Sequence, residues 1–259
     1  MTHGVTGRNT STHAPAVRGL APNMDPMTNA TAPAPALWTP PAAVRVRGAL
    51  ALVAGAGETA RVYERFGSRI AVDGYVVAAF EAPAAADAAA WLAVQEHAPR
   101  VLVGSDRGAA AVLALAAHGA PVDGVIVAGT PAGPGDDAAA DDAERTACPV
   151  HLGVLGEAAA RATSAVVAAE IDLPAAAALG SVSVPVLAIH GGADTIAPLA
   201  AAREALAPIA QLDLVETVDG LHDALNDASH RSVAATIILW LERLRAAGVQ
   251  TPIVREIVR

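Results

Sequence analysis

The chain has 259 residues, enough for one medium-sized domain with a buried core. Its formal net charge of −9 argues against a nucleic-acid partner, because phosphate recognition requires a basic surface. The single cysteine, Cys148, can supply neither an intramolecular disulfide nor a cysteine-based metal site.

The first 42 residues are rich in Thr, Asn, Pro and Ala and show no periodicity. This composition predicts a disordered tail over 1–42, followed by one domain over 43–259. The tail lacks the charged start and apolar stretch of a secretory signal. No apolar run reaches the roughly 18 residues of a membrane span. We therefore expect a cytoplasmic protein with no membrane span.

From Val44 onward, apolar strands alternate with amphipathic helices. The near-continuous apolar runs are typical of strands that are buried on both faces of a parallel sheet. The expected strands are 44–55 (one long strand or a strand pair), 75–83, 100–104, 122–130, 184–191 and 212–220. The expected helices are 60–74, 85–98, 106–119, 199–210 and 229–248.

Residues 131–183 interrupt this alternation. They contain an acidic stretch at 135–144, a strand-like run at 148–156 and two Ala-rich helical pieces. We interpret them as an insertion that forms a small lid. The fold class is therefore α/β, with a mostly parallel central sheet covered by helices on both faces.

The segment "VLVGSDRGAA" (101–110) predicts a strand that enters a helix through a tight turn. Gly104 and Gly108 supply the small flanking residues that the nucleophile elbow of α/β hydrolases requires. In this frame Asp106 occupies the tip of the turn, and Ser105 points sideways from the strand end. Such glycine-flanked turns are common, so the frame alone is only moderately specific.

Two later strand ends carry polar residues. "HGGADTIAP" places Asp194 just after a strand, and "DGLHDALND" places His222 after the next one. The order nucleophile, acid, histidine, separated by roughly 90 and then 30 residues, is the chain order of α/β hydrolases. The segment "VAGAGETARVYERF" follows an early strand and is suited to donating a backbone N–H to an oxyanion.

Together these segments resemble the monoacylglycerol lipase and lysophospholipase branch of the α/β hydrolases over about residues 48–130 and 184–246. The resemblance implies that Asp194 is the acid and His222 the base of a triad. It implies oxyanion N–H donors at Ala56 and Arg107, with Gly57 as a further candidate. Where that branch has a nucleophilic serine, this chain has Asp106.

An aspartate at the tip is similar to the epoxide hydrolase and dehalogenase branches. "GSDRGA" resembles the elbow of fluoroacetate dehalogenases, but the second arginine expected there is Ala110. The tryptophan that follows the nucleophile in haloalkane dehalogenases is Arg107. The lid contains neither Tyr nor Trp, so it lacks the phenols that activate an epoxide oxygen.

The chemistry of a carboxylate nucleophile limits the class of substrate that we predict. Attack at a saturated carbon gives an ordinary ester, which His222 and water could hydrolyse, whereas attack on a carboxylic ester would give a mixed anhydride. We therefore predict a cofactor-free, metal-free hydrolase of a small, apolar substrate with the triad Asp106, His222 and Asp194.

Several alternatives stay open from the sequence. Asp106 could act as a base in an esterase or lyase, or it could only cap the helix of a degenerate, non-catalytic homologue that binds a ligand or partner. A shifted turn would make Ser105 the nucleophile. His190 is expected to be a packed core histidine, and Asp136 is a weaker alternative for the triad acid.

Overall fold

The computed structural model describes residue 1 and residues 34–131, 140–157, 172–246 and 253–254. The chain divides into two units, Met1–Ala32 and Pro33–Arg259, and every helix and strand described here lies in the second. The strands are β1 (Ala36–Trp38), β2 (Gly48–Val53), β3 (Tyr75–Phe80), β4 (Arg100–Ser105), β5 (Gly124–Ala128), β6 (Val186–Gly191) and β7 (Leu212–Thr217). The helices are η1 (Ala60–Tyr63), α1 (Glu64–Val72), η2 (Ala82–Ala84), α2 (Ala85–Ala93), α3 (Arg107–Ala117), α4 (Asp142–Arg145), α5 (Pro149–Leu155), α7 (Ala176–Leu179), α8 (Leu199–Leu206) and α9 (His230–Arg245).

The seven strands form one sheet in the order β1-β3-β2-β4-β5-β6-β7. All neighbouring pairs are parallel except β1 and β3, which are antiparallel. The central strands β2, β4 and β5 consist almost entirely of buried residues, as the apolar runs predicted. Because parallel strands end at the same edge of a sheet, the residues that follow them converge there.

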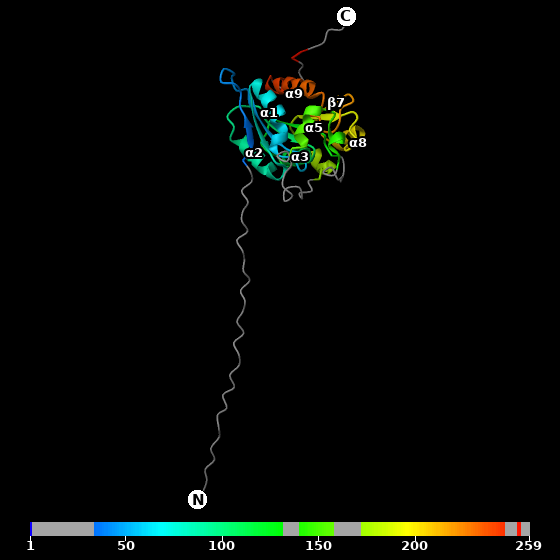
Figure 1. Ribbon diagram of the computed structural model, residues 1–259. Helices are drawn as coiled ribbons and strands as arrows, with labels where there is room; N and C mark the ends of the chain where they lie inside the picture. The colour runs from blue at the N-terminus through cyan, green and yellow to red at the C-terminus, as the bar shows by residue number, and fades with distance from the viewer. Residues whose placement is uncertain (2–33, 132–139, 158–171, 247–252, 255–259) are drawn as a thin grey trace. The chain divides into compact units, whose positions relative to one another are not determined.

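Helices cover both faces of this sheet, as expected (Figure 1). Along β2, Leu50 and Leu52 join the core formed with α1 and α9, where Trp240 is fully buried. The alternate residues Ala51 and Val53 join the opposite core, formed with α2, α3 and α8. This period of two follows from the pleat of the strand. Among the described residues, no helix combines the length and hydropathy needed to cross a membrane.

Residues 36–38, which the sequence analysis assigned to the tail, form the edge strand β1. The composition, rich in Thr, Asn, Pro and Ala, suggested a tail, but an edge strand tolerates proline. Trp38 packs against the core that contains Leu50 and Leu52. The ordered domain therefore begins before residue 43. Residues 2–33 of the predicted tail lie outside the described residues.

The strand-like run at 148–156 is wrong as a strand, because it forms the helix α5. Pro149 occupies its first turn, where a proline is favoured, and the buried residues His151 and Leu155 are four positions apart on one helical face. Short apolar runs do not distinguish the two structures. Of the two alternatives predicted for 44–55, one long strand or a strand pair, the structure has a single strand, β2, over Gly48–Val53. Of the predicted lid, α4, α5 and α7 are described, whereas 132–139 and 158–171 lie outside the described residues.

We predict that a side chain at position 108 would lower the stability of the fold. A Cβ atom at Gly108 in α3 would lie 2.1 Å from the carbonyl oxygen of Val53, whereas a Cβ at the exposed Gly153 in α5 would contact nothing within 4 Å. We expect Gly108→Ala to lower the free energy of unfolding by roughly 1–3 kcal/mol or more, and Gly153→Ala to raise it by about 0.5–1 kcal/mol. Urea unfolding followed by circular dichroism measures both, and equal effects would contradict this assignment.

Candidate active site

Asp106 stands alone in the turn between β4 and α3 with a left-handed backbone (φ 51°, ψ −123°). Such a conformation is costly for a residue other than glycine. The turn is stabilised by a hydrogen bond from the Asp106 N–H to the carbonyl of Ala128 (2.9 Å). Although Asp106 immediately precedes α3, its side chain makes no capping hydrogen bond. This observation contradicts the alternative that it only caps the helix.

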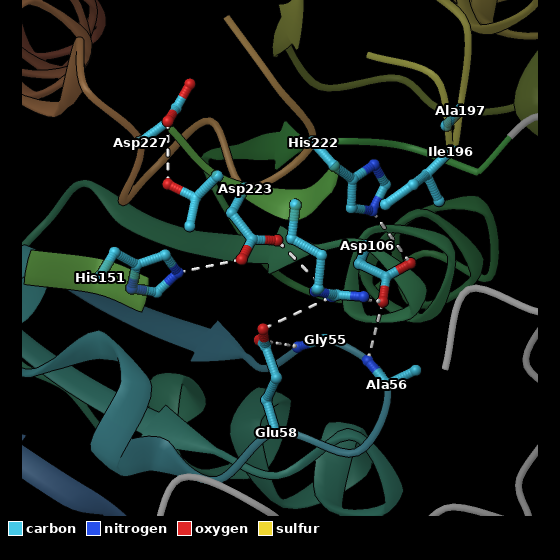
Figure 2. Close-up of polar contacts among 12 residues, drawn as sticks. Gly55, Ala56, Glu58, Asp106, His151, Ile196, Ala197, His222, Asp223 and Asp227 are labelled. Carbon is cyan, nitrogen blue, oxygen red and sulfur yellow. Dashed lines mark hydrogen bonds and ion pairs between the residues drawn. The ribbon is translucent and has the colours of Figure 1, made fainter. Parts of the chain in front are cut away.

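The two carboxylate oxygens of Asp106 have different surroundings (Figure 2). Oδ2 accepts a hydrogen bond from the backbone N–H of Ala56 (2.9 Å) and lies 3.5 Å from Nη2 of Arg145. Oδ1 lies 3.5 Å from Nε2 of His222, and neither of these two atoms has a hydrogen-bond partner among the described residues. One carboxylate oxygen is therefore held in place, while the other faces the imidazole with its hydrogen-bonding capacity unused.

Asp194 fixes the opposite side of the His222 ring. Its Oδ2 lies 2.8 Å from Nδ1 of His222, and its Oδ1 accepts hydrogen bonds from the N–H groups of Ile196 and Ala197, both 2.9 Å. His190 is buried, as expected, but its Nε2 also lies 3.2 Å from Oδ2 of Asp194. The structure thus brings together Asp106, His222 and Asp194 from three separate segments of the chain.

Burial and charge act in opposite directions on these groups. Burial disfavours a charged His222, yet the carboxylates of Asp106 and Asp194 outweigh it and raise the pKa of His222 to about 10. Burial likewise disfavours a charged Asp106, but His222, Arg145 and the Ala56 N–H hold its pKa below the ordinary value. Against burial, His190 and His222 lower the pKa of Asp194. At neutral pH the site therefore holds an imidazolium between two carboxylates.

A second buried group, which sequence reasoning missed, adjoins Asp106. Nη2 of Arg145, at the end of α4, lies 3.5 Å from a carboxylate oxygen of each of Glu58, Asp106 and Asp223. Figure 2 shows the labelled carboxylates of Glu58, Asp106 and Asp223 pointing toward one shared region. Nε2 of His151 lies 2.9 Å from Asp223 on its other side.

Glu58, one of the carboxylates near Arg145, has two further hydrogen-bond partners and a raised pKa. It accepts a hydrogen bond from the hydroxyl of Tyr63 (2.5 Å) and one from the N–H of Gly55 (3.2 Å). Burial and the charge of Asp223 raise the pKa of Glu58, although Arg145 opposes them. Glu58 lies inside the predicted oxyanion segment and Asp223 follows His222, so both had a neighbouring signal in the sequence, whereas Arg145 had none.

Asp227 fastens the α4 segment to the His222 loop. Its Oδ1 accepts hydrogen bonds from the hydroxyl of Thr146 and the N–H of Ala147, both 2.8 Å, and its Oδ2 accepts one from the N–H of Leu221 (2.9 Å). The N–H of Asp223 donates to the carbonyl of Arg145 (2.9 Å). Part of the predicted lid is therefore tied directly to the loop that carries the candidate base.

The roles predicted for Ser105, Arg107, Gly57 and Asp136 stay predictions. Ser105 is buried at the end of β4, one position before the strained residue. Arg107 begins α3 with its guanidinium 3.7 Å from Asp172, and donation by its backbone N–H stays a prediction. Gly57 adopts a positive φ of 68° in the turn beside Ala56. Asp136 lies outside the described residues.

A metal site is not evident in the part of the chain that the structure describes: no group of three or more His, Cys, Asp or Glu side chains is arranged to hold an ion. The expectation that the protein needs neither metal nor cofactor stays a prediction. Asp106 and His222 are each 1% exposed, so both side chains are enclosed by protein.

The raised pKa of His222 predicts a pH-dependent stability. An unfolded histidine has a pKa near 6.5, so the contribution of the imidazolium is fully present below that pH and is lost as pH rises through about 10. We expect the free energy of unfolding to fall by ~1 kcal/mol per pH unit between pH 7 and 10. Urea unfolding at one-unit intervals measures this slope. His222→Gln should remove it, and the exposed His118→Gln should retain it; an equal slope in His222→Gln would contradict the assignment.

The three hydrogen bonds to Asp227 predict a structural role. In Asp227→Asn, an NH₂ group replaces one of the two carboxylate oxygens. This NH₂ group would face the N–H or hydroxyl group that donates to that oxygen in the natural protein, so one hydrogen bond is lost. We therefore expect a loss of roughly 1–3 kcal/mol in unfolding free energy. Asp213→Asn, which disturbs a partly exposed ion pair with Arg243, is the matched control and should change stability by less than about 1 kcal/mol. Thermal and urea unfolding compare the two variants, and an equal loss in both would remove this role.

No protein-family model matches the sequence, and a search of curated proteins gives no significant match. The structure is similar to a monoacylglycerol lipase from Paleococcus ferrophilus, with a TM-score of 0.67, 16% identity and coverage of 80% of this chain and 97% of that one.

Two further solved structures show the same likeness. A soluble variant of monoglyceride lipase from Saccharomyces cerevisiae gives a TM-score of 0.63 at 14% identity, covering 80% of this chain and 90% of that one. An esterase from Rhodococcus sp. gives 0.60 at 21% identity, covering 75% and 91%. At these identities the likeness concerns the fold. Together with the mostly parallel seven-stranded sheet, it confirms the predicted architecture: the chain has the α/β-hydrolase fold.

Proposed function

We propose that this protein is a cofactor-free hydrolase in which Asp106 is the nucleophile, His222 activates water and Asp194 orients His222. The observation that carries the proposal is the asymmetry of the Asp106 carboxylate. Oδ2 is bound by the N–H of Ala56, and Oδ1, without a hydrogen-bond partner among the described residues, faces His222. A nucleophilic oxygen must have a lone pair available for the substrate, and Oδ1 meets that condition.

The first step would form an ester on Asp106. Oδ1 attacks a saturated carbon that carries a leaving group such as a halide. The new C–O bond forms as the bond to the leaving group breaks, and the leaving group departs with the electron pair. Asp106 becomes neutral, and Oδ2 becomes the carbonyl oxygen of the ester, still beside the N–H of Ala56.

The second step depends on the pKa of His222. Esterification removes one of the two carboxylate charges that keep the imidazole protonated, so the pKa of His222 falls and its proton can pass to solvent. The neutral ring then takes a proton from water, and the hydroxide adds to Cγ of Asp106. The tetrahedral intermediate carries its negative charge on Oδ2. It collapses to the protonated Asp106 side chain and an alkoxide, which takes the proton from His222 and leaves as the alcohol. The Asp106 carboxylic acid then gives its proton to the neutral His222, which restores the carboxylate and the imidazolium.

The substrate class follows from the same chemistry. Attack by Asp106 on a carboxylic ester would give a mixed anhydride, so a lipase- or esterase-type substrate fits less well than an alkyl halide. Epoxides would need an acid for the alkoxide, and the sequence of the lid contains no Tyr or Trp. Because the site is enclosed and the surrounding sequence is rich in alanine, we propose a small, apolar organohalide as the substrate class.

Isotope labelling tests the nucleophile directly. After a single turnover in ¹⁸O-water, we expect one ¹⁸O atom in the side chain of Asp106, because water adds to Cγ of the ester. Mass spectrometry of the peptide that contains Asp106 measures the label, with an organohalide, epoxide and ester panel as substrates. Turnover without label in Asp106 would show that it acts as a base instead.

Substitution of the nucleophile provides the matched comparison. Asp106→Asn should lower kcat/KM by roughly 10⁴-fold or more, provided that mass spectrometry excludes deamidation. Asp87→Asn, at an exposed position in α2, should retain activity. If no member of the panel is consumed by the natural protein, a non-catalytic binding protein replaces this proposal.

A further inference from the structure

Arg145 contacts the same oxygen of Asp106 that the Ala56 N–H binds. Its Nη2 lies 3.5 Å from Oδ2 of Asp106, whereas Nε2 of His222 lies 3.5 Å from the other oxygen, Oδ1. The residue is 2% exposed, although arginine is rarely buried to this extent. A buried guanidinium placed against one particular oxygen calls for a physical account.

The guanidinium is held in place by its own helix and by its neighbours. Asp141 and Glu144 form a capping box at the start of α4. At the other end, the N–H of Asp223 donates to the carbonyl of Arg145. The carboxylates of Glu58 and Asp223 each lie 3.5 Å from Nη2, which offsets the cost of removing the charge from water.

We propose that Arg145 is a catalytic residue that stabilises the oxyanion on Oδ2 while the Asp106 ester is hydrolysed, an inference that rests on the proposed function. The ester leaves Oδ2 nearly neutral, so the negative charge of Asp106, one of the carboxylates 3.5 Å from Nη2 of Arg145, is lost. Addition of hydroxide to Cγ restores a full negative charge to Oδ2. The interaction is therefore stronger in the tetrahedral intermediate than in the ester, which is the condition for accelerating that step.

The same contact has the opposite effect on the first step. In the free protein Arg145 stabilises the carboxylate, and that stabilisation is lost as Oδ1 forms the ester and the negative charge departs with the leaving group. Removing Arg145 should therefore spare ester formation and slow ester hydrolysis. A residue with a purely structural role would not separate the two steps in this way.

Single-turnover kinetics with an organohalide that the protein consumes measure both steps. Rapid acid quenching and mass spectrometry of the Asp106 peptide follow ester formation and decay. In Arg145→Met we expect ester formation at least as fast as in the natural protein, because the attacking carboxylate loses the stabilisation by Arg145. We expect decay slower by roughly 10²–10³-fold, as for loss of an oxyanion donor, so that the ester accumulates. Arg145→Lys should recover part of the decay rate. Arg243→Met, whose ion pair with Asp213 is remote from the site, should leave both rates unchanged.

The outcomes separate this inference from the proposed function. If the natural protein forms no ester, the proposed function fails and this inference fails with it. If the natural protein forms the ester and Arg145→Met hydrolyses it at the natural rate, or if both steps slow equally, only the role of Arg145 is overturned. Should Arg145→Met fail to fold, the charge-compensated variant Arg145→Met/Asp223→Asn replaces it, compared with Asp223→Asn alone and with the same expected separation of rates.

Discussion

Burial of the Asp106 carboxylate is the constraint on which the rest of the site depends. A charge that is 1% exposed must find its compensation within the protein. The N–H of Ala56, the imidazole of His222 and the guanidinium of Arg145 provide it. These groups come from the end of β2, the loop after β7 and the end of α4. The site can exist only where the carboxyl ends of the parallel strands bring these segments to one edge of the sheet.

The sequence predicted the parts of the site whose signals are local. Gly104 and Gly108 frame the turn because any side chain there would meet backbone, with a Cβ at Gly104 only 2.3 Å from the carbonyl oxygen of Gly108. Asp194 and His222 follow recognisable strands, so their convergence could be inferred from topology. Apolar strands that alternate with amphipathic helices were likewise enough to predict a parallel sheet covered by helices on both faces.

The parts that sequence reasoning missed depend on contacts between distant segments. Arg145 is 39 residues from Asp106 and 87 from Glu58, and nothing in its own segment indicates that it enters the core. Its helix, α4, lies within residues 131–183, which the sequence identified only as an insertion that forms a lid. The helix α5 was missed for a related reason, since its apolar residues fit a strand equally well until the burial of His151 and Leu155 on one face decides between them.

An aspartate at the tip of the turn changes what the histidine must do. A serine hydroxyl would be neutral, so His222 would face one carboxylate and could serve as a base from the outset. Here two carboxylates keep the ring protonated, and the pKa of His222 is about 10. A base with that pKa is inactive at neutral pH until one of the charges is removed.

In the mechanism proposed above, formation of an ester on Asp106 would remove that charge at the point in the cycle where a base is needed. In the ester, His222 retains only Asp194 as an anionic partner, and the pKa of the ring can approach neutrality. Arg145 then has fewer negative neighbours, and the oxyanion on Oδ2 restores the missing charge. The two cations thus respond to one event in complementary ways, since His222 becomes able to release its proton while Arg145 becomes better matched to the intermediate. The proposed mechanism requires that Asp106 is buried, because in water the loss of one carboxylate charge would shift neither group appreciably.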